Sequence, residues 1–184
     1  MKKNNKLPTK LFWVDLEMTG LDPEKDVILE VAAEITDFKF KTLESYEAMV
    51  RGGNRKTVVQ RMQANTWWAD FPGNRDTFVD GLEEATPLGV VEDELIDLLK
   101  KHFGNEPAIL AGNSIHSDRA FIKKWWPSLD LKLHYRMLDV SSFKVLMQGK
   151  YGEEFEKDNP HRAYDDIQAS IAELEHYIEF MKTS

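Results

Sequence analysis

The sequence contains no cysteine, and none of its apolar runs is long enough to span a membrane. Without cysteine, neither disulfides nor a cysteine-ligated metal can hold the fold together, which suits an intracellular setting. The first ten residues are basic and polar, and no apolar stretch follows them, so we expect no secretory signal. We therefore expect a cytoplasmic protein without a membrane partner.

An excess of basic residues is also missing. The chain has 24 Lys and Arg against 32 Asp and Glu, a formal net charge of −8. Proteins that bind long nucleic acids by neutralising phosphates usually carry a basic surface. The charge leaves two alternatives: a protein that does not bind nucleic acid, or one that binds a piece too short to need a basic track. Part of the negative charge could also belong to a metal site, where cations offset it.

The composition and the apolar patterns predict one globular α/β domain. The chain has 184 residues, of which 42% are hydrophobic and 11% aromatic, enough to bury a core. Residues 11–17, 27–36 and 46–51 read as strands with short connections, so the sheet should begin with antiparallel strands. We expect residues 1–9 to form a flexible N-terminus ahead of this domain.

Helices dominate the rest of the chain. Thr86 followed by Pro87 predicts a capped helix to about residue 103. Residues 108–111 and 134–140 predict strands, residues 118–126 a helix, and Ser141 or Ser142 should cap a helix to residue 147. A polar loop over 149–160 precedes a last helix with an apolar stripe at Ile167, Ile171, Leu174 and Ile178. The fold class is a mixed sheet flanked by helices.

Asp15 and Glu17 stand two residues apart at the end of the first predicted strand. Their side chains therefore project from the same face. Two neighbouring buried carboxylates are costly unless a cation lies between them, and Mg²⁺ and Mn²⁺ prefer such oxygen ligands. Taken alone, the pair is more typical of a strand end that emerges into solvent.

Three later residues complete a set of candidates. Asp118 and Asp166 lie near the starts of predicted helices, where a carboxylate is also favoured by the helix dipole. His161 lies five residues before Asp166, and a neutral imidazole there could take a proton from an attacking water. A lone histidine at a helix start is more often a surface or capping residue. Each candidate has an ordinary explanation by itself, but their order and surrounding sequences point to one site.

Four segments resemble motifs of the oligoribonuclease family of DEDDh exonucleases. The first motif corresponds to DLEMTGLD at residues 15–22, and the second to GNSIHSDR at residues 112–119. The third corresponds to HRAYDDI at residues 161–167, which has the His-x₄-Asp spacing of the DEDDh subclass. A further family segment is matched by HYRMLDVS at residues 134–141. The resemblance thus extends over nearly the whole chain.

This resemblance implies a ribonuclease H-like fold and a 3′-to-5′ exoribonuclease that releases nucleoside 5′-monophosphates. The family's acidic ligands for two Mg²⁺ or Mn²⁺ ions correspond to Asp15, Glu17, Asp118 and Asp166, and its general base to His161. Leu21 resembles the family's wedge between the two terminal bases, and Met18 belongs to the same substrate-binding motif. A base-stacking tryptophan corresponds to Trp67 or Trp68, while at least one of the two is expected in the core.

The resemblance also implies a homodimer that selects short RNA. In the family, the residue matching Ser114 joins those matching Tyr135 and Arg136 of the partner subunit to cap the 5′ phosphate of a dinucleotide. An arginine suits this role because it contacts a phosphate with two parallel hydrogen bonds. A substrate of two to about five nucleotides needs no long basic surface, which fits the acidic composition.

The sequence departs from the family between residues 60 and 82. QANTWWADFP at residues 63–72 does not align cleanly, and FVDGL at residues 78–82 lacks a histidine that the family often has there. Two rival functions follow from the same motifs. One is a DEDDh exonuclease that degrades DNA or longer strands. The other is a non-catalytic binding or scaffold protein that kept the fold, which predicts the loss of an acidic ligand, yet none is missing.

Overall fold

The described residues, 8–156 and 162–183 of a computed structural model, form a single α/β domain around a mixed sheet. The strands are β1 (Lys10–Met18), β2 (Ile28–Asp37), β3 (Thr42–Arg51), β4 (Thr86–Pro87), β5 (Ala108–Gly112) and β6 (Leu133–Asp139). Their order in the sheet is β4-β3-β2-β1-β5-β6. The pairs β1–β2 and β2–β3 are antiparallel, as expected, whereas β1–β5, β5–β6 and β3–β4 are parallel.

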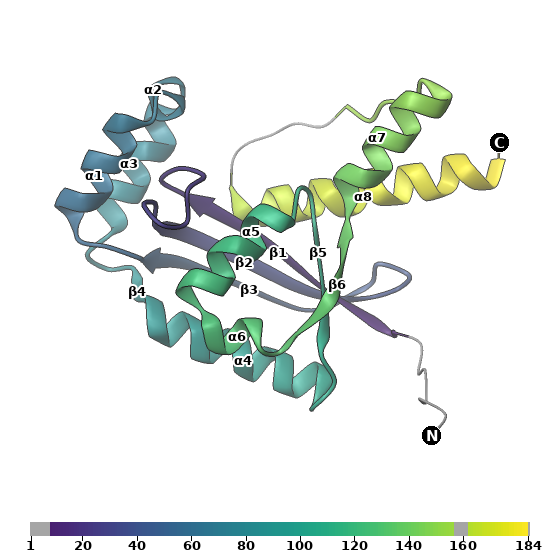
Figure 1. Ribbon diagram of the computed structural model, residues 1–184, viewed down its shortest axis with the longest axis horizontal. Helices are drawn as coiled ribbons and strands as arrows, with labels where there is room; N and C mark the ends of the chain where they lie inside the picture. Colours follow the sequence, from purple (N-terminus) through teal and green to yellow (C-terminus); the bar gives the residue numbers. More distant parts are fainter. Residues whose placement is uncertain (1–7, 157–161, 184) are drawn as a thin grey trace.

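Helices cover both faces of the sheet (Figure 1). They are α1 (Arg55–Ala64), α2 (Trp67–Asp70), α3 (Pro72–Gly81), α4 (Leu88–Phe103), α5 (His116–Trp125), α6 (Pro127–Asp130), α7 (Val140–Tyr151) and α8 (Ala163–Thr183). Helices α4, α5 and α6 pack on one face, and α8 lies on the other with the start of α7. The first three helices form a separate group beside one end of the sheet.

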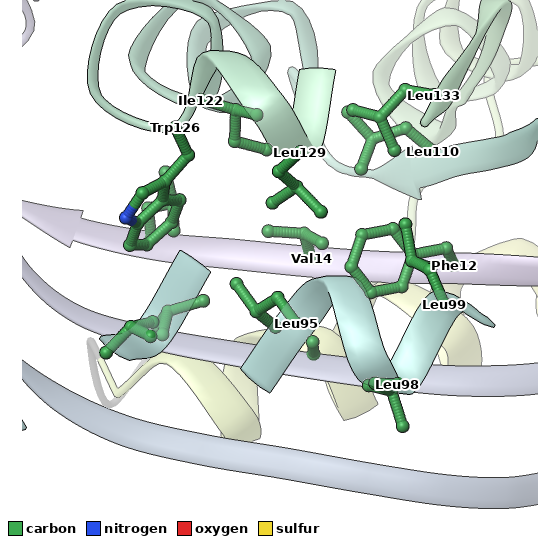
Figure 2. Packing of buried hydrophobic residues seen from close by; sticks show 14 of the residues in the cluster. Phe12, Val14, Leu95, Leu98, Leu99, Leu110, Ile122, Trp126, Leu129 and Leu133 are labelled. Atoms are coloured by element: carbon green, nitrogen blue, oxygen red, sulfur yellow. The ribbon is translucent and has the colours of Figure 1, made fainter. Parts of the chain in front are cut away.

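The central strand β1 divides its side chains between two cores. Phe12 and Val14 belong to the larger one, where leucines of α4 such as Leu95 and Leu99 pack against them (Figure 2). Leu11 and Trp13 point to the opposite face, toward α8. Because side chains alternate along a strand, Asp15 and Glu17 continue the face of Leu11 and Trp13. The strand thus carries its carboxylates toward the beginning of α8.

Helices α1 to α3 were not predicted from the sequence. In α1, only Val58 and Met62 are buried, so the helix shows no continuous apolar stripe of the kind that reveals an amphipathic helix. The group is held instead by a third core, in which Trp68 and Phe78 pack on Val27 of the segment leading into β2. These contacts join residues that are far apart in the chain, which local patterns do not report.

Two predicted helix caps were wrong. Thr86 and Pro87 form the short strand β4, which pairs with β3, and α4 begins one residue later, at Leu88. The predicted serine cap of α7 is replaced by Asp139, whose side chain accepts a hydrogen bond from the Ser141 N–H at 2.9 Å. An aspartate is at least as good a cap as serine, so α7 begins at Val140 and reaches Tyr151, inside the expected polar loop.

The sequence predicted no membrane-spanning segment and a flexible N-terminus. Within residues 8–156 and 162–183, no helix combines the length and the apolar character needed to cross a membrane. The expected flexible N-terminus covers residues 1–9, of which 1–7 lie outside the described residues.

Leu95→Ala should destabilise the fold. The side chain is 1% exposed between α4 and the sheet, and truncating a buried leucine costs about 2–5 kcal/mol. Urea unfolding of the two proteins measures the difference. Val90→Ala on the same helix is the matched control, because Val90 is 44% exposed and should change stability by no more than about 0.5 kcal/mol. Equal effects of the two substitutions would contradict the packing described here.

Candidate metal centre

Three carboxylates from distant parts of the chain meet at the end of β1. Oxygens of Asp15, Glu17 and Asp166 all lie within 4.8 Å of one another. The first two come from the last residues of β1, and Asp166 comes from the first turn of α8. The structure therefore brings these three predicted acids together.

The fourth predicted acid, Asp118, reaches the same strand end from α5. It is not one of the three clustered acids, but its Oδ1 accepts a hydrogen bond from the backbone N–H of Leu16 at 3.1 Å. Leu16 stands between Asp15 and Glu17, so the Asp118 carboxylate adjoins them along the backbone of β1. Its side chain is buried in the first turn of α5, close to the predicted helix start.

Burial makes two of these acids, Glu17 and Asp118, hard to ionise. The pKa of Glu17 is raised from 4.5 to about 8, first by burial and then by the charges of Asp166 and Glu30. The pKa of Asp118 is raised to about 7, again mainly by burial. A cation at this position would favour the ionised forms and displace the protons. The donor set consists only of carboxylate oxygens, so the site fits a hard divalent cation such as Mg²⁺ or Mn²⁺.

The segment after β1 is held rigidly beside the cluster. The Thr19 carbonyl accepts hydrogen bonds from Trp68 Nε1 at 3.0 Å and from Asn65 Nδ2 at 3.1 Å. Thr19 Oγ1 also donates to Asp26 Oδ1 at 2.9 Å. At Gly20 the chain passes so close to this aspartate that an added Cβ would lie 2.6 Å from Asp26 Oδ2. The loop that follows the two carboxylates is thus fixed to α1 and α2.

The predicted wedge residue is exposed on this loop. Leu21 is 81% exposed and borders an open pocket of about 670 Å³, which Arg61 and Asn65 of the α1–α2 segment also line. The sequence interpretation did not single out these two residues, because α1, which carries Arg61 and ends just before Asn65, was not predicted. Met18 is half-buried and packs against the larger core.

The two tryptophans have different environments. Trp68 is 1% exposed and packs in the third core, so it is the core residue of the pair. Trp67 is half-buried, and its ring stacks on Phe71 with centroids 4.4 Å apart. Of the two candidates, only Trp67 has a ring that is accessible in part.

Ser114 lies in a strained turn between β5 and α5. It is exposed and has a φ of 47°, in the left-handed region that non-glycine residues seldom adopt. Its N–H donates to Asp139 Oδ1 at 3.0 Å and to Ser141 Oγ at 2.9 Å. Ser141 Oγ donates to Asn113 Oδ1, and Asn113 Nδ2 donates to buried Glu173 of α8. A hydrogen-bond network therefore compensates for the backbone strain and ties this turn to α8.

The remaining predicted residues lie on the edge strand β6 or outside the described chain. Tyr135 is 74% exposed, and the guanidinium carbon of exposed Arg136 lies 5.3 Å from the centre of its ring. His161 belongs to residues 157–161, which lie outside the described residues.

The sequence of this chain is similar to those of known nucleases. A family model described as exonuclease matches residues 12–174. A Caenorhabditis elegans protein named probable oligoribonuclease is 39% identical, over 98% of this chain and 94% of its own length. The Corynebacterium glutamicum oligoribonuclease is 42% identical, over 91% of this chain and 78% of that protein. The human mitochondrial oligoribonuclease is 35% identical, over 96% and 75% of the two chains.

Solved structures support the fold. An exonuclease I of Escherichia coli, in a zinc-bound complex with single-stranded DNA, superposes with a TM-score of 0.61 at 13% identity. The superposition covers 96% of this chain but only 43% of the other. Exonuclease I of Methylocaldum szegediense gives a TM-score of 0.56 at 14% identity over 90% and 39% of the two chains. This similarity confirms the ribonuclease H-like fold. From the exonuclease match and the relatives above 30% identity, the chain belongs to the oligoribonuclease family and is a nuclease.

Proposed function

We propose that this nuclease is a 3′-to-5′ exoribonuclease that degrades short RNAs, dinucleotides above all, to nucleoside 5′-monophosphates. The observation that carries the proposal is the convergence of Asp15, Glu17 and Asp166, with Asp118 alongside, in a chain of the oligoribonuclease family. Carboxylates at this density suit phosphodiester hydrolysis because they can hold divalent cations, which would offset the negative charge that accumulates on the phosphate.

In this proposal, the four acids hold two Mg²⁺ or Mn²⁺ ions. When bound, such ions lower the pKa of a coordinated water and stabilise charge on the phosphate that is attacked. The chain contributes a rigid frame: Asp15 and Glu17 are fixed by β1, Asp166 by the first turn of α8, and Asp118 by its bond to the Leu16 N–H. His161 is the proposed general base, on the basis of its sequence motif alone, because an imidazole accepts protons near neutral pH.

The terminal bases would be held by residues on either side of the loop after β1. Leu21, exposed and beside the open pocket, is the proposed wedge between the bases. Trp67 is the proposed stacking residue, since Trp68 is committed to the core. Met18 would contact the substrate from the end of β1. Stacking on an aromatic ring contributes about 1–3 kcal/mol per base and tolerates any base.

The preference for very short RNA would come from a second copy of the chain. Ser114 would bind the 5′ phosphate together with Tyr135 and Arg136 of the partner subunit. A homodimer is supported by large apolar side chains exposed on β6 and α7, an arrangement typical of an interaction surface; these are Tyr135, Met137, Val145 and Leu146. A site closed at the 5′ end is also consistent with the net charge of −8.

Asp166→Asn should abolish hydrolysis of a 5′-phosphorylated RNA dinucleotide. The substitution keeps the shape but removes a ligand charge, so we expect the rate to fall by about 10³-fold or more. The adjacent residue offers a matched control: Asp165 is exposed in the same turn of α8 and is not one of the clustered acids. Asp165→Asn should stay within about twofold of the parent protein. Undiminished hydrolysis by Asp166→Asn would refute both the acidic site and its metals.

Mg²⁺ should stabilise the protein more at high pH than at low pH. In the metal-free fold the pKa of Glu17 is about 8, against an ordinary value of 4.5. The folded state therefore binds more protons than the unfolded state between these values, and stability falls as the pH rises through this interval. A cation that replaces the proton reverses this loss of stability. At a concentration a hundred times its dissociation constant, it adds about 2.7 kcal/mol to the free energy of unfolding.

Urea unfolding with and without Mg²⁺, at about pH 5.5 and about pH 8.5, measures this effect. Glu17→Gln removes the titrating group and should make the Mg²⁺ increment smaller and less dependent on pH. Exposed Glu83→Gln serves as the control. An equal Mg²⁺ increment at both pH values in the parent protein would contradict the assignment.

Arg136→Ala should separate short substrates from long ones. Rates are compared on 5′-phosphorylated RNAs of two, five and twenty nucleotides. The parent protein should prefer the dinucleotide, and the variant should lose about 10²-fold on it but little on the longest RNA, because only the shortest substrate needs the phosphate contact. Sedimentation should show a dimer for both proteins.

Two results of this series would favour the rival functions. Equal parent rates at every length, or faster cleavage of matched DNA, would replace the proposal with a general exonuclease. No cleavage of any substrate would favour a binding or scaffold role.

A further inference from the structure

Two buried glutamates face each other across β1 and β2. Glu17 and Glu30 are paired in the register of the two antiparallel strands, and they are 9% and 6% exposed. Directly opposite side chains in such a pair have Cβ atoms about 4.5–5.5 Å apart, and like charges there are destabilising. Each carboxylate therefore needs a positive charge of its own. For Glu17 this is the proposed metal.

For Glu30 the positive charge is part of the protein. Arg162 Nε lies 3.2 Å from both carboxylate oxygens of Glu30, and its Nη2 lies 2.5 Å from Oε1. Glu30 Oε2 also accepts a hydrogen bond from the Ala163 N–H at 3.1 Å. A two-pronged contact of this kind fixes orientation as well as charge. Both oxygens of Glu30 are thus engaged before any metal arrives.

The same contact determines where α8 begins. Arg162 and Ala163 are the residues at the start of the helix, and the Asp166 N–H donates to the Arg162 carbonyl at 3.0 Å. Holding Arg162 against β2 therefore holds the first turn, and with it the Asp166 carboxylate, against Asp15 and Glu17. Arg162 also directly follows His161 in the sequence.

We propose that the Glu30–Arg162 ion pair is a positioning device for the metal centre: it sets Asp166 in place and keeps Glu30 from acting as an additional ligand. The proposal rests on the proposed function only for its effect on turnover. Its effect on metal binding stands independently. Glu30 and Arg162 are positioning residues, because they act through Asp166 and Glu17.

The two halves of the pair should have opposite effects on metal binding. Arg162→Gln leaves Glu30 as an unpaired buried carboxylate beside Glu17, so Mn²⁺ should bind more tightly. Glu30→Gln leaves a guanidinium near Glu17 that competes with the ion, so Mn²⁺ should bind more weakly. Outer partners of metal ligands typically alter affinity or activity by roughly 10–100-fold, and we expect changes at the lower end of that range. The double variant Glu30→Gln/Arg162→Gln should return to within about threefold of the parent affinity.

Calorimetric titration with Mn²⁺ and steady-state kinetics on an RNA dinucleotide test the proposal together. All three variants should lower kcat by roughly 10–100-fold with little change in KM, because Asp166 still reaches the metal but is no longer held in its orientation, while the substrate contacts remain. Glu34→Gln is the matched control. Like Glu30, Glu34 is buried on β2 and projects from the same face of the strand, and it accepts a hydrogen bond from Gln168 of α8. It should leave Mn²⁺ affinity unchanged.

The outcomes are distinguishable. If Arg162→Gln and Glu30→Gln both weaken Mn²⁺ binding, or neither differs from Glu34→Gln, the pair is only structural and the proposal is overturned. Should a single variant fail to fold, the double variant, which leaves no unpaired charge, decides the same question through kcat. If the parent protein cleaves no RNA while Mn²⁺ binding responds as expected, the proposed function fails and the positioning role stands.

Discussion

Repulsion between carboxylates at the end of β1 is the constraint that organises this molecule. Carboxylate oxygens of Asp15, Glu17 and Asp166 lie within 4.8 Å of one another, and Glu30 stands opposite Glu17 on the neighbouring strand. A folded protein tolerates such a group only when cations or protons compensate it. The chain supplies one cation itself, Arg162, and in the proposed function a diffusible ion compensates the remaining acids. This division would turn an unfavourable cluster into a site for a cation.

The rest of the fold supplies the rigidity that the cluster requires. β1 is central in the sheet, with apolar contacts on both faces, so its last residues cannot move apart to relieve the repulsion. Helix α8 packs along the same face as the acids and brings Asp166 to them. On the far side, hydrogen bonds from Trp68 and Asn65 hold the loop after the strand. A cluster on flexible loops would spread, and its affinity for an ion would fall.

Much of this was readable from the sequence. The apolar run at residues 11–14, which turns polar at Asp15, predicted the strand. The two-residue spacing of Asp15 and Glu17 predicted that both would point the same way. The stripe along α8 and the position of Asp166 before it likewise followed from local periodicity, which depends on backbone geometry alone. The family motifs added Asp118. Helices α1 to α3 were missed because their burial depends on a core shared with Val27 and Leu29 rather than on their own pattern.

The sequence by itself thus determined most strands, the later helices and the acids that meet at the end of β1, since these follow from spacing, residue type and motif. Only the tertiary structure decided which charges compensate each other. Glu30 and Arg162 are separated by 132 positions, and nothing in the local sequence marks them as a pair. It also decided that Trp68 is a core residue and that Trp67 is not, although the two are adjacent. Contacts between segments that meet only when the chain folds decide which group pairs with a buried charge. The same contacts decide which of two identical neighbouring residues is buried.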